Sequence, residues 1–285
     1  MSRKPAKDAV HDRFEIFSLK GRRAVVTGGA TGLGFHMAQS LLRAGAEVLI
    51  GARRENVLKE AVEQLNGSFD GQIASYLLVD LSDRSDIDAF AQSAIERLGG
   101  VDIFVGNAAD VGKAEFSSIG AEAMARTVQV NLLSNIQLTQ RFVPHMRNQR
   151  WGRLIFSSSI NSIAGAHRDT SVYATAKSGL NALARELAVD YGRDNITANS
   201  LILGFWLSTM NLEEERRLRE VEGDVAARNY LDRIGASIAA GRLGRPEEVE
   251  GVINLLASDA GSYINGSNLV VDGGKSIMMF PRAIE

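Results

Sequence analysis

The chain has 285 residues, of which 45% are hydrophobic and 23% are charged, and its formal net charge is −2. Such a composition suits a globular protein with one sizeable core, and the near-neutral charge predicts neither a nucleic-acid nor a membrane partner. The sequence contains no cysteine, which excludes disulfides and thiolate metal sites and favours a reducing, cytoplasmic location. We expect no metal site.

The N-terminal residues are polar and charged, without the apolar core of a signal peptide. No later apolar run is long enough to span a bilayer. We expect residues 1–18 to form a flexible extension and residues 19–285 to form one domain.

From residue 20 onward, short apolar runs alternate with helical patterns. The predicted strands are 24–27, 47–50, 75–79, 101–105, 153–156, 197–203 and 268–271. The predicted helices are 33–43, 55–65, 84–98 and a long stretch around Asn131. Strands that are apolar throughout and separated by helices predict an α/β fold: a single doubly wound parallel sheet of the Rossmann type, with helices on both faces.

Residues 211–240 are strongly charged and helical in pattern. A charge run is usually a solvated helical face, but the position after the carboxyl end of a strand also suits a mobile lid. Both interpretations remain open for a helical segment covering about residues 205–240.

A glycine-rich turn links the first strand to the first helix. Glycines allow a tight turn and let a pyrophosphate approach the backbone, where N–H groups at the helix start face the phosphates. The residues predicted to bind a dinucleotide here are Gly28, Ala30, Thr31, Gly32, Leu33 and Gly34.

The end of the second strand carries Arg53 and Arg54, where an acid would bind the 2′-hydroxyl of NAD. Two guanidinium groups suit a 2′-phosphate, so NADP(H) is favoured over NAD(H) unless both side chains simply face water. We expect Asp80 either to bind the adenine amino group or to cap the next helix, a cap that Ser82 could also provide. Leu81 is also predicted to contact the cofactor.

Tyr173 and Lys177 lie four residues apart, a spacing that places both side chains on one face of a helix. A phenol ordinarily loses its proton near pH ~10, and a neighbouring ammonium group lowers that pKa. A tyrosine tuned in this way can exchange a proton with a substrate hydroxyl while a hydride moves to or from a nicotinamide ring. Tyrosine and lysine at this spacing often occur by chance, usually as an exposed pair. The assignment therefore depends on other features of the sequence that agree with it.

Three serines end the fifth predicted strand, and in an open α/β sheet ligands gather at the carboxyl ends of strands. We expect the Ser159 hydroxyl to orient the substrate oxygen, and Ser157 and Ser158 to be turn residues. Asn131 lies in an apolar helical pattern, where a buried amide either ties the structure together or holds a water that relays protons.

These residues together resemble the single-domain short-chain dehydrogenase/reductase family over about residues 19–274. The matching motifs are Thr27-Gly28-x-x-x-Gly32-x-Gly34, Asp80, Asn131, Ser159, Tyr173-x-x-x-Lys177, Gly241-Arg242-x-Gly244-x-Pro246-Glu247-Glu248-Val249, Asn265-Gly266 and Val271-Asp272-Gly273-Gly274. The resemblance implies an NAD(P)-dependent oxidoreductase that acts on CH–OH or C=O groups.

The resemblance also implies a role for each chemical residue. Tyr173 would be the catalytic acid/base, and Lys177 would lower its pKa and bind the nicotinamide ribose. Ser159 would hold the substrate oxygen and Asn131 would complete a proton relay. A homotetramer, with the long helices packed between subunits, is implied as well.

Three positions depart from the family pattern. The usual Asn-Asn-Ala-Gly after the fourth strand appears as Gly106-Asn107-Ala108-Ala109, and the usual Pro-Gly after the sixth appears as Leu203-Gly204. Ser208 replaces the expected threonine. We expect Asn107, Ala108 and Ser208 to contact the cofactor, together with Tyr173 and Lys177, although these departures affect where the nicotinamide ring lies.

Within the family, residues 17–21 and Arg53 resemble gluconate 5-dehydrogenases and related sugar or polyol reductases, and 3-oxoacyl-carrier-protein reductases are similar too. The predicted substrate is a small alcohol or ketone, with a sugar acid or polyol favoured. Arg168 would pair with a substrate carboxylate or be merely exposed, and Trp206 would line the pocket or pack under the lid. His167 is given no role.

Two other functions remain open. A non-catalytic sensor could bind the dinucleotide without turnover, but it would need no proton donor. A nucleotide-sugar epimerase would use the same tyrosine and lysine, but such enzymes resemble longer chains with a C-terminal substrate domain, which we do not expect here.

Overall fold

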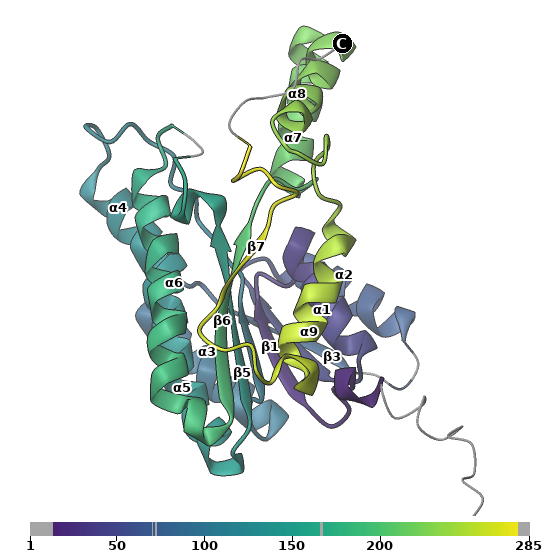
Figure 1. Cartoon of the computed structure of the whole chain (residues 1–285), viewed down its shortest axis with the longest axis vertical. Coiled ribbons are helices and arrows are strands. Elements are labelled where there is room, and N and C mark those ends of the chain that lie inside the picture. The colour runs from purple at the N-terminus through teal and green to yellow at the C-terminus, as the bar shows by residue number, and fades with distance from the viewer. Residues whose placement is uncertain (1–13, 70, 72, 166–167, 279–285) are drawn as a thin grey trace, which may run out of the picture.

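The computed structural model describes residues 14–69, 71, 73–165 and 168–278, and within them the strands form one parallel sheet (Figure 1). Its order is β3-β2-β1-β4-β5-β6-β7. The strands are β1 (Arg23–Thr27), β2 (Glu47–Ala52), β3 (Ala74–Leu78), β4 (Ile103–Gly106), β5 (Gly152–Ser159), β6 (Ile196–Leu203) and β7 (Asn268–Val271). The predicted doubly wound sheet is confirmed, and only the strand ends move by a few residues.

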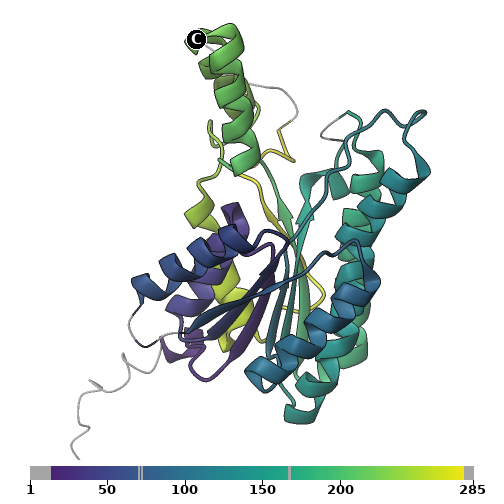
Figure 2. The ribbon, with the colours of Figure 1, turned by 180° about the vertical axis from the view of Figure 1, so that it is seen from behind.

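Helices cover both faces of the sheet (Figure 2). They are α1 (Gly32–Arg43), α2 (Glu55–Ser68), α3 (Arg84–Leu98), α4 (Ala121–Val128), α5 (Ser134–Gln149), α6 (Ser171–Tyr191), α7 (Thr209–Glu222), α8 (Asp224–Ala236) and α9 (Glu250–Ala257). One hydrophobic core lies between the sheet and α1, α2 and α9, and a second lies beneath α3, α5 and α6. Strands that are buried on both faces explain why their sequences are apolar without alternation.

The strand order reverses beside β1, which pairs with β2 on one side and with β4 on the other. At such a reversal the following helices leave toward opposite faces, and a crevice opens at the carboxyl ends of the strands. The register places Thr27 beside Gly106, Gly106 beside Phe156, and Ser159 beside Leu203. The segments that follow β1, β4, β5 and β6 therefore meet at one edge of the sheet.

Two segments differ from a regular α/β pattern. The long helix predicted around Asn131 is interrupted by a π-helical turn, Gln129–Leu133, between α4 and α5. The charged segment 211–240 contains the paired helices α7 and α8, which project beyond the carboxyl edge of the sheet (Figure 1).

Residues 1–13 of the expected extension lie outside the described part, and Glu15–Phe17 form a short 3-10 turn. Among the helices of the described residues, none combines the length and apolar character needed to cross a membrane.

Candidate active site

The turn between β1 and α1 is so tight that only glycine fits at two of its positions. Gly28 adopts a φ of +66°, in the left-handed region. A Cβ on Gly34 would lie 2.1 Å from the Gly28 carbonyl oxygen, so any side chain there would push the turn open. The Thr31 side chain makes no capping bond to α1, which leaves N–H groups of the first turn for a ligand. This cradle, which a Cβ would fill, fits a dinucleotide pyrophosphate.

Asn107 ties the glycine turn to the neighbouring strands. Its Nδ2 donates to the carbonyl oxygens of Thr27 at 3.2 Å and Gly28 at 3.3 Å. Its Oδ1 accepts from the Ser157 hydroxyl at 3.2 Å, while the Ala108 backbone N–H donates to Thr27 Oγ1. The structure thus places Asn107 and Ala108 beside the cradle, with the amide bracing β1, β4 and β5.

Arg53 and Arg54 are exposed immediately after β2, where the sequence predicted the ribose contact. Asp80 lies within electrostatic range of Arg53, although hydrogen bonds from Ser82 are the main reason that the pKa of this carboxyl lies below its ordinary value. Its neighbour Leu81 is buried. The adenosine end of a dinucleotide would therefore meet a surface with two exposed arginines, bordered by the Asp80 carboxylate.

The sequence allowed Asp80 or Ser82 to cap α3, but neither residue does so. Asp83 occupies that position, and its carboxylate accepts hydrogen bonds from the backbone N–H groups of Ser85 and Asp86. Asp80 instead closes a small turn by accepting from the Ser82 backbone and hydroxyl. Asp80 is therefore not used as a helix cap, and one of its carboxylate oxygens accepts both bonds from Ser82.

Tyr173 and Lys177 share one face of α6, as their spacing predicted. The Lys177 ammonium nitrogen lies 5.6 Å from the centroid of the tyrosine ring. Lys177 is only 1% exposed, and its Nζ donates to the Ser157 carbonyl oxygen at 2.6 Å. Burial lowers the pKa of Lys177 to about 7, because the surroundings cannot solvate a full charge.

The expected lowering of the tyrosine pKa is not seen in the protein by itself. Burial raises the pKa of the Tyr173 phenol, and a hydrogen bond with the Ser159 side chain offsets part of that rise. The physical reason is that Lys177 is itself desolvated and is turned toward the Ser157 carbonyl. The phenol is therefore held protonated, in the state that donates to a substrate oxygen.

The three serines lie within β5, so Ser157 and Ser158 are buried strand residues and not the expected turn residues, and the contacts of the three differ. Ser157 donates to Asn107, and the Ser158 hydroxyl bonds the Lys177 carbonyl oxygen and the Ser162 hydroxyl. Ser159 Oγ accepts from the Asn161 backbone N–H at 3.2 Å and also bonds the phenol of Tyr173. Of the three hydroxyls, that of Ser159 is thus the one placed beside the phenol.

Asn131 lies in the π-helical turn and is completely buried. Its Nδ2 donates to the carbonyl oxygens of Asp110 at 2.6 Å and Thr127 at 2.8 Å, and its Oδ1 accepts from the Asp110 backbone at 3.3 Å. Of the two expected roles, a structural tie or the holder of a relay water, the Asn131 side chain therefore has the structural one. A relay through this residue would use its main-chain carbonyl, which accepts one bond from Asn135.

Three further predicted residues lie on the segments after β5 and β6. Arg168 is exposed, and His167 lies outside the described residues. Trp206 is only 6% exposed, packs in the core on the α9 side and pairs its backbone with Gly244. It also lines a cavity of about 180 Å³, so it is both a core residue and a cavity wall. Ser208 is the residue that caps α7, its hydroxyl accepting from the Asn211 N–H at 3.4 Å.

Sequence reasoning gave no role to Asn161, which follows the serines at the edge of the site. The signal was a polar residue two positions beyond Ser159, in a loop that leads to the tyrosine helix. Its backbone N–H bonds Ser159 Oγ, and its side chain bonds Thr170 at the start of α6.

An open glycine cradle, with a phenol, an ammonium group and a hydroxyl gathered at the same sheet edge, defines a nicotinamide-dependent oxidoreductase with a doubly wound domain. A family model described as enoyl-(acyl carrier protein) reductase matches residues 28–276. The chain belongs to the short-chain dehydrogenase/reductase family, whose members are NAD(P)-dependent enzymes acting on CH–OH or C=O groups.

Similar proteins span nearly the whole chain. The L-rhamnose 1-dehydrogenase (NADP+) of Thermoplasma acidophilum is 33% identical over 264 residues, which cover 92% of this chain and 99% of that protein. The rhamnolipids biosynthesis 3-oxoacyl-[acyl-carrier-protein] reductase of Pseudomonas aeruginosa is 32% identical, covering 90% and 97%. The crystal structure of L-sorbose reductase from Gluconobacter frateurii, complexed with NADPH and L-sorbose, has a TM-score of 0.87 at 26% identity, covering 91% and 98%.

Proposed function

We propose that this enzyme uses NADP(H) to interconvert a small polyhydroxylated alcohol and its carbonyl form, with a sugar acid or polyol as the substrate class. The observation that carries the proposal is the joint position of Tyr173, Ser159 and Lys177 at the sheet edge beside the open start of α1. Relatives named for L-rhamnose and L-sorbose support the sugar and polyol class.

Each chemical residue has a proposed task. A dinucleotide held in the cradle would supply the hydride in reduction or accept it in oxidation. Ser159 orients the substrate oxygen, and Tyr173 donates the proton to that oxygen in reduction or removes it in oxidation. Lys177, buried and hydrogen-bonded next to the phenol, binds the nicotinamide ribose and stabilises the phenolate left after proton transfer. Asn131 keeps the π-helical turn in place and offers its main-chain carbonyl to a proton relay.

The preference for NADP(H) is assigned to Arg53, which follows β2 and lies near the Asp80 carboxylate. A guanidinium group suits the 2′-phosphate, whereas a carboxylate would repel it. We predict that Arg53→Asp shifts the ratio of kcat/KM for NADPH over NADH by at least about tenfold toward NADH. Arg84→Asp, an equal charge change at an exposed position on α3, serves as the control. An unchanged ratio in Arg53→Asp would assign the preference elsewhere.

The segment 205–240 is proposed to act as a lid. The helices α7 and α8 pack on each other and stand beyond the carboxyl edge of the sheet. Ser208, the N-cap of α7, is proposed to move with this hairpin and to contact the nicotinamide end of the cofactor. A hairpin with little contact to the sheet can close over a substrate and exclude water.

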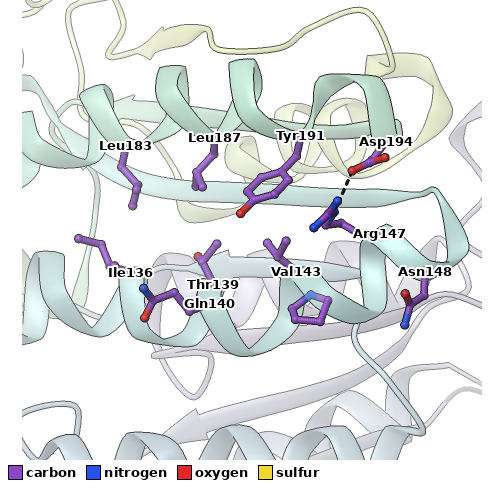
Figure 3. Close-up of a pocket in the computed structure, with 11 residues that line it drawn as sticks. Ile136, Thr139, Gln140, Val143, Arg147, Asn148, Leu183, Leu187, Tyr191 and Asp194 are labelled. Carbon is purple, nitrogen blue, oxygen red and sulfur yellow. Dashed lines mark hydrogen bonds and ion pairs between the residues drawn. The ribbon is translucent and has the colours of Figure 1, made fainter.

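A homotetramer is proposed from the outer face of α5 and α6. These helices enclose a groove of about 580 Å³, lined on one side by Ile136, Thr139 and Val143 and on the other by Leu183, Leu187 and Tyr191 (Figure 3). The buried Thr139 hydroxyl makes no hydrogen bond within the described residues. The groove also carries polar side chains, among them the ion pair of Arg147 with Asp194. An open groove of mixed character along two long helices suits packing against the same helices of a second copy. The chain's lack of cysteine supports a cytoplasmic location for the assembly.

A 3-oxoacyl-carrier-protein reductase is the second candidate, supported by the Pseudomonas relative that carries this name. A panel of keto-sugars, keto-sugar acids, simple ketones and 3-oxoacyl thioesters, followed by nicotinamide absorbance with NADPH and NADH, separates the two. We expect the highest kcat/KM with a polyhydroxylated ketone and NADPH. The thioester as best substrate would replace the first proposal by the second. Tight nucleotide binding without turnover on any compound would favour a sensor.

A further inference from the structure

The carboxamide oxygen of Asn161 is buried and has no hydrogen-bond partner in the described part of the chain. Asn161 lies in the 3-10 turn Ile160–Ser162, which leads from β5 toward α6. A buried acceptor without a partner is unfavourable, and proteins usually satisfy such atoms. An orphaned acceptor that lies beside a reaction site therefore points to a ligand that completes it.

The rest of the Asn161 amide is firmly anchored. Its backbone N–H donates to Ser159 Oγ at 3.2 Å, and its Nδ2 donates to Thr170 Oγ1 at 3.0 Å. Thr170 immediately precedes α6 and lies three residues before Tyr173. The residue thus links the serine to the start of the tyrosine helix, with its backbone on the serine side and its side chain on the Thr170 side. Because Nδ2 is bonded on the α6 side, Oδ1 is directed away from Thr170.

The turn that carries Asn161 is also held rigidly against α6. The Ser162 hydroxyl donates to the Ser159 carbonyl oxygen at 2.6 Å and accepts from Asn181 Nδ2 at 2.9 Å. The Ser178 hydroxyl donates to the Ser162 carbonyl oxygen at 3.1 Å. A polar group supported in this way is already oriented before a ligand arrives, which favours binding and discrimination.

Two buried asparagines of the same region have both ends of their amides bonded, whereas Gln129 in the π-helical turn has, like Asn161, one buried amide atom without a partner among the described residues. The side chain of Asn131 uses both ends of its amide within the protein. Asn181 does the same, with Nδ2 bonded to Ser162 and Oδ1 accepting from Ser200. Asn161 has one end bonded and one end open. Turning its amide over would leave Nδ2 in place of Oδ1 without a partner, so an open polar group remains in either orientation.

We infer that Asn161 is a substrate-binding residue that accepts a hydrogen bond from a hydroxyl on the carbon next to the reacting one. The inference rests on the proposed function, since it takes Ser159 as the partner of the reacting oxygen. The Asn161 backbone N–H bonds that same serine hydroxyl, so the residue lies beside the proposed position of the reacting oxygen. A hydroxyl on the adjacent carbon is the donor that its unpartnered Oδ1 would accept from. The preferred class is then an α-hydroxy ketone or a vicinal diol. A 3-oxoacyl thioester offers only carbonyl acceptors near its ketone and cannot satisfy this oxygen.

The test uses two ketones that differ by one hydroxyl, 1-hydroxybutan-2-one and butan-2-one, with NADPH. We expect the native enzyme to prefer the hydroxy ketone. In Asn161→Leu, kcat/KM for the hydroxy ketone should fall by about tenfold or more, chiefly through KM, while that for butan-2-one stays within about threefold. Asn161→Asp keeps an acceptor and should retain most of the preference. Asn181→Leu is the matched control, because it changes a fully bonded amide beside the same turn and should lower stability without changing the substrate ratio.

Several outcomes would overturn the inference. One is an equal loss on both ketones in a folded Asn161→Leu enzyme, and another is no loss on either. A native enzyme that reduces simple ketones or thioesters but does not favour the added hydroxyl would also overturn it, while leaving the oxidoreductase proposal intact. If neither these ketones nor the wider panel is reduced, the proposed function and this inference fall together.

Discussion

At the scale of single residues, burial is the main cause of the pKa shifts of Tyr173 and Lys177 on α6. Lys177 is almost fully enclosed, with its ammonium nitrogen donating to one backbone carbonyl. Burial without an anionic partner lowers the pKa of the lysine to about 7 and raises the pKa of Tyr173. Both shifts favour neutral groups, so the protein alone holds a phenol ready to donate its proton and does not store a phenolate.

Lys177 should make folding stability depend on pH in a defined window. Below about 7 the lysine is protonated in the folded and unfolded chains, and its burial penalty is present in full. Between about 7 and the ordinary value of 10.5 only the unfolded chain holds the proton, so stability rises with pH through that range. Lys177→Met removes this rise and should be more stable than the native chain at pH ~6 by about 3–5 kcal/mol.

The measurement is denaturant unfolding at several pH values between these limits. The exposed Lys59→Met on α2 controls for the loss of a positive charge. An advantage of Lys177→Met that stays constant from low to high pH would contradict the account of the buried lysine.

Residue spacing predicted the shared face of Tyr173 and Lys177, because a helix repeats every 3.6 residues. It did not predict the direction of the tyrosine pKa, because that depends on how deeply tertiary packing buries each group. The sequence did not identify the residue that caps α3, for a similar reason. Asp80, Ser82 and Asp83 are all good capping residues, and only the position where the helix begins selects Asp83.

At the scale of elements, the π-helical turn explains the buried Asn131. A π turn frees carbonyl groups from the regular helical pattern, and the Asn131 amide bonds the carbonyl of Thr127 as well as the loop at Asp110. The apolar periodicity around Asn131 predicted a helix but not its interruption. One extra residue in a turn leaves almost no trace in a hydrophobic pattern, so this feature could be found only in the structure.

The α7–α8 hairpin depends on Asn211 at its base. Asn211 Nδ2 donates to the Trp206 carbonyl oxygen at 2.8 Å, and its Oδ1 accepts from the Tyr230 hydroxyl at 3.1 Å. These bonds join α7, α8 and the segment after β6. Asn211→Ala should loosen the hairpin by about 1–3 kcal/mol, since it removes both bonds, although the Trp206 carbonyl oxygen keeps its bond from the Ser208 N–H at 2.7 Å.

The expected result is faster amide hydrogen exchange in α7 and α8 together with a raised KM. Arg219→Ala is the control, because it removes only surface ion pairs with Glu215 and Asp224 and should change exchange little. Faster exchange in α7 and α8 with an unchanged KM would separate the hairpin from substrate binding and count against a lid.

At the scale of the whole molecule, apolar strands alternating with helices were sufficient to predict a parallel, doubly wound sheet. The order of the strands carries the function, because it brings the ends of β1, β4, β5 and β6 to one edge. The cofactor cradle was predictable since only glycine satisfies the Gly28 and Gly34 geometry. The orphaned oxygen of Asn161 was not, because an unmet hydrogen bond is visible only when all neighbours are placed.

Assembly through the α5–α6 groove gives a prediction at the same scale. Leu187→Arg places a charge among the apolar side chains of the groove and should reduce the particle mass measured by light scattering. Val189→Arg, two residues along α6 at a position 79% exposed and outside that groove, is the matched control and should leave the mass unchanged. A native chain that is already monomeric, or an unaltered mass in Leu187→Arg, would contradict assembly through this face.

The most direct test of the account is Tyr173→Phe, which removes one hydroxyl from the centre of the site. The variant should bind NADPH as the native chain does, because the cradle lies on β1 and α1, and its kcat should fall by about 10²–10⁴-fold on the best carbonyl substrate. Ligand titration by fluorescence and steady-state turnover measure the two properties on the same preparation. Turnover that survives the loss of the phenol, with nucleotide binding intact, would show that another group moves the proton.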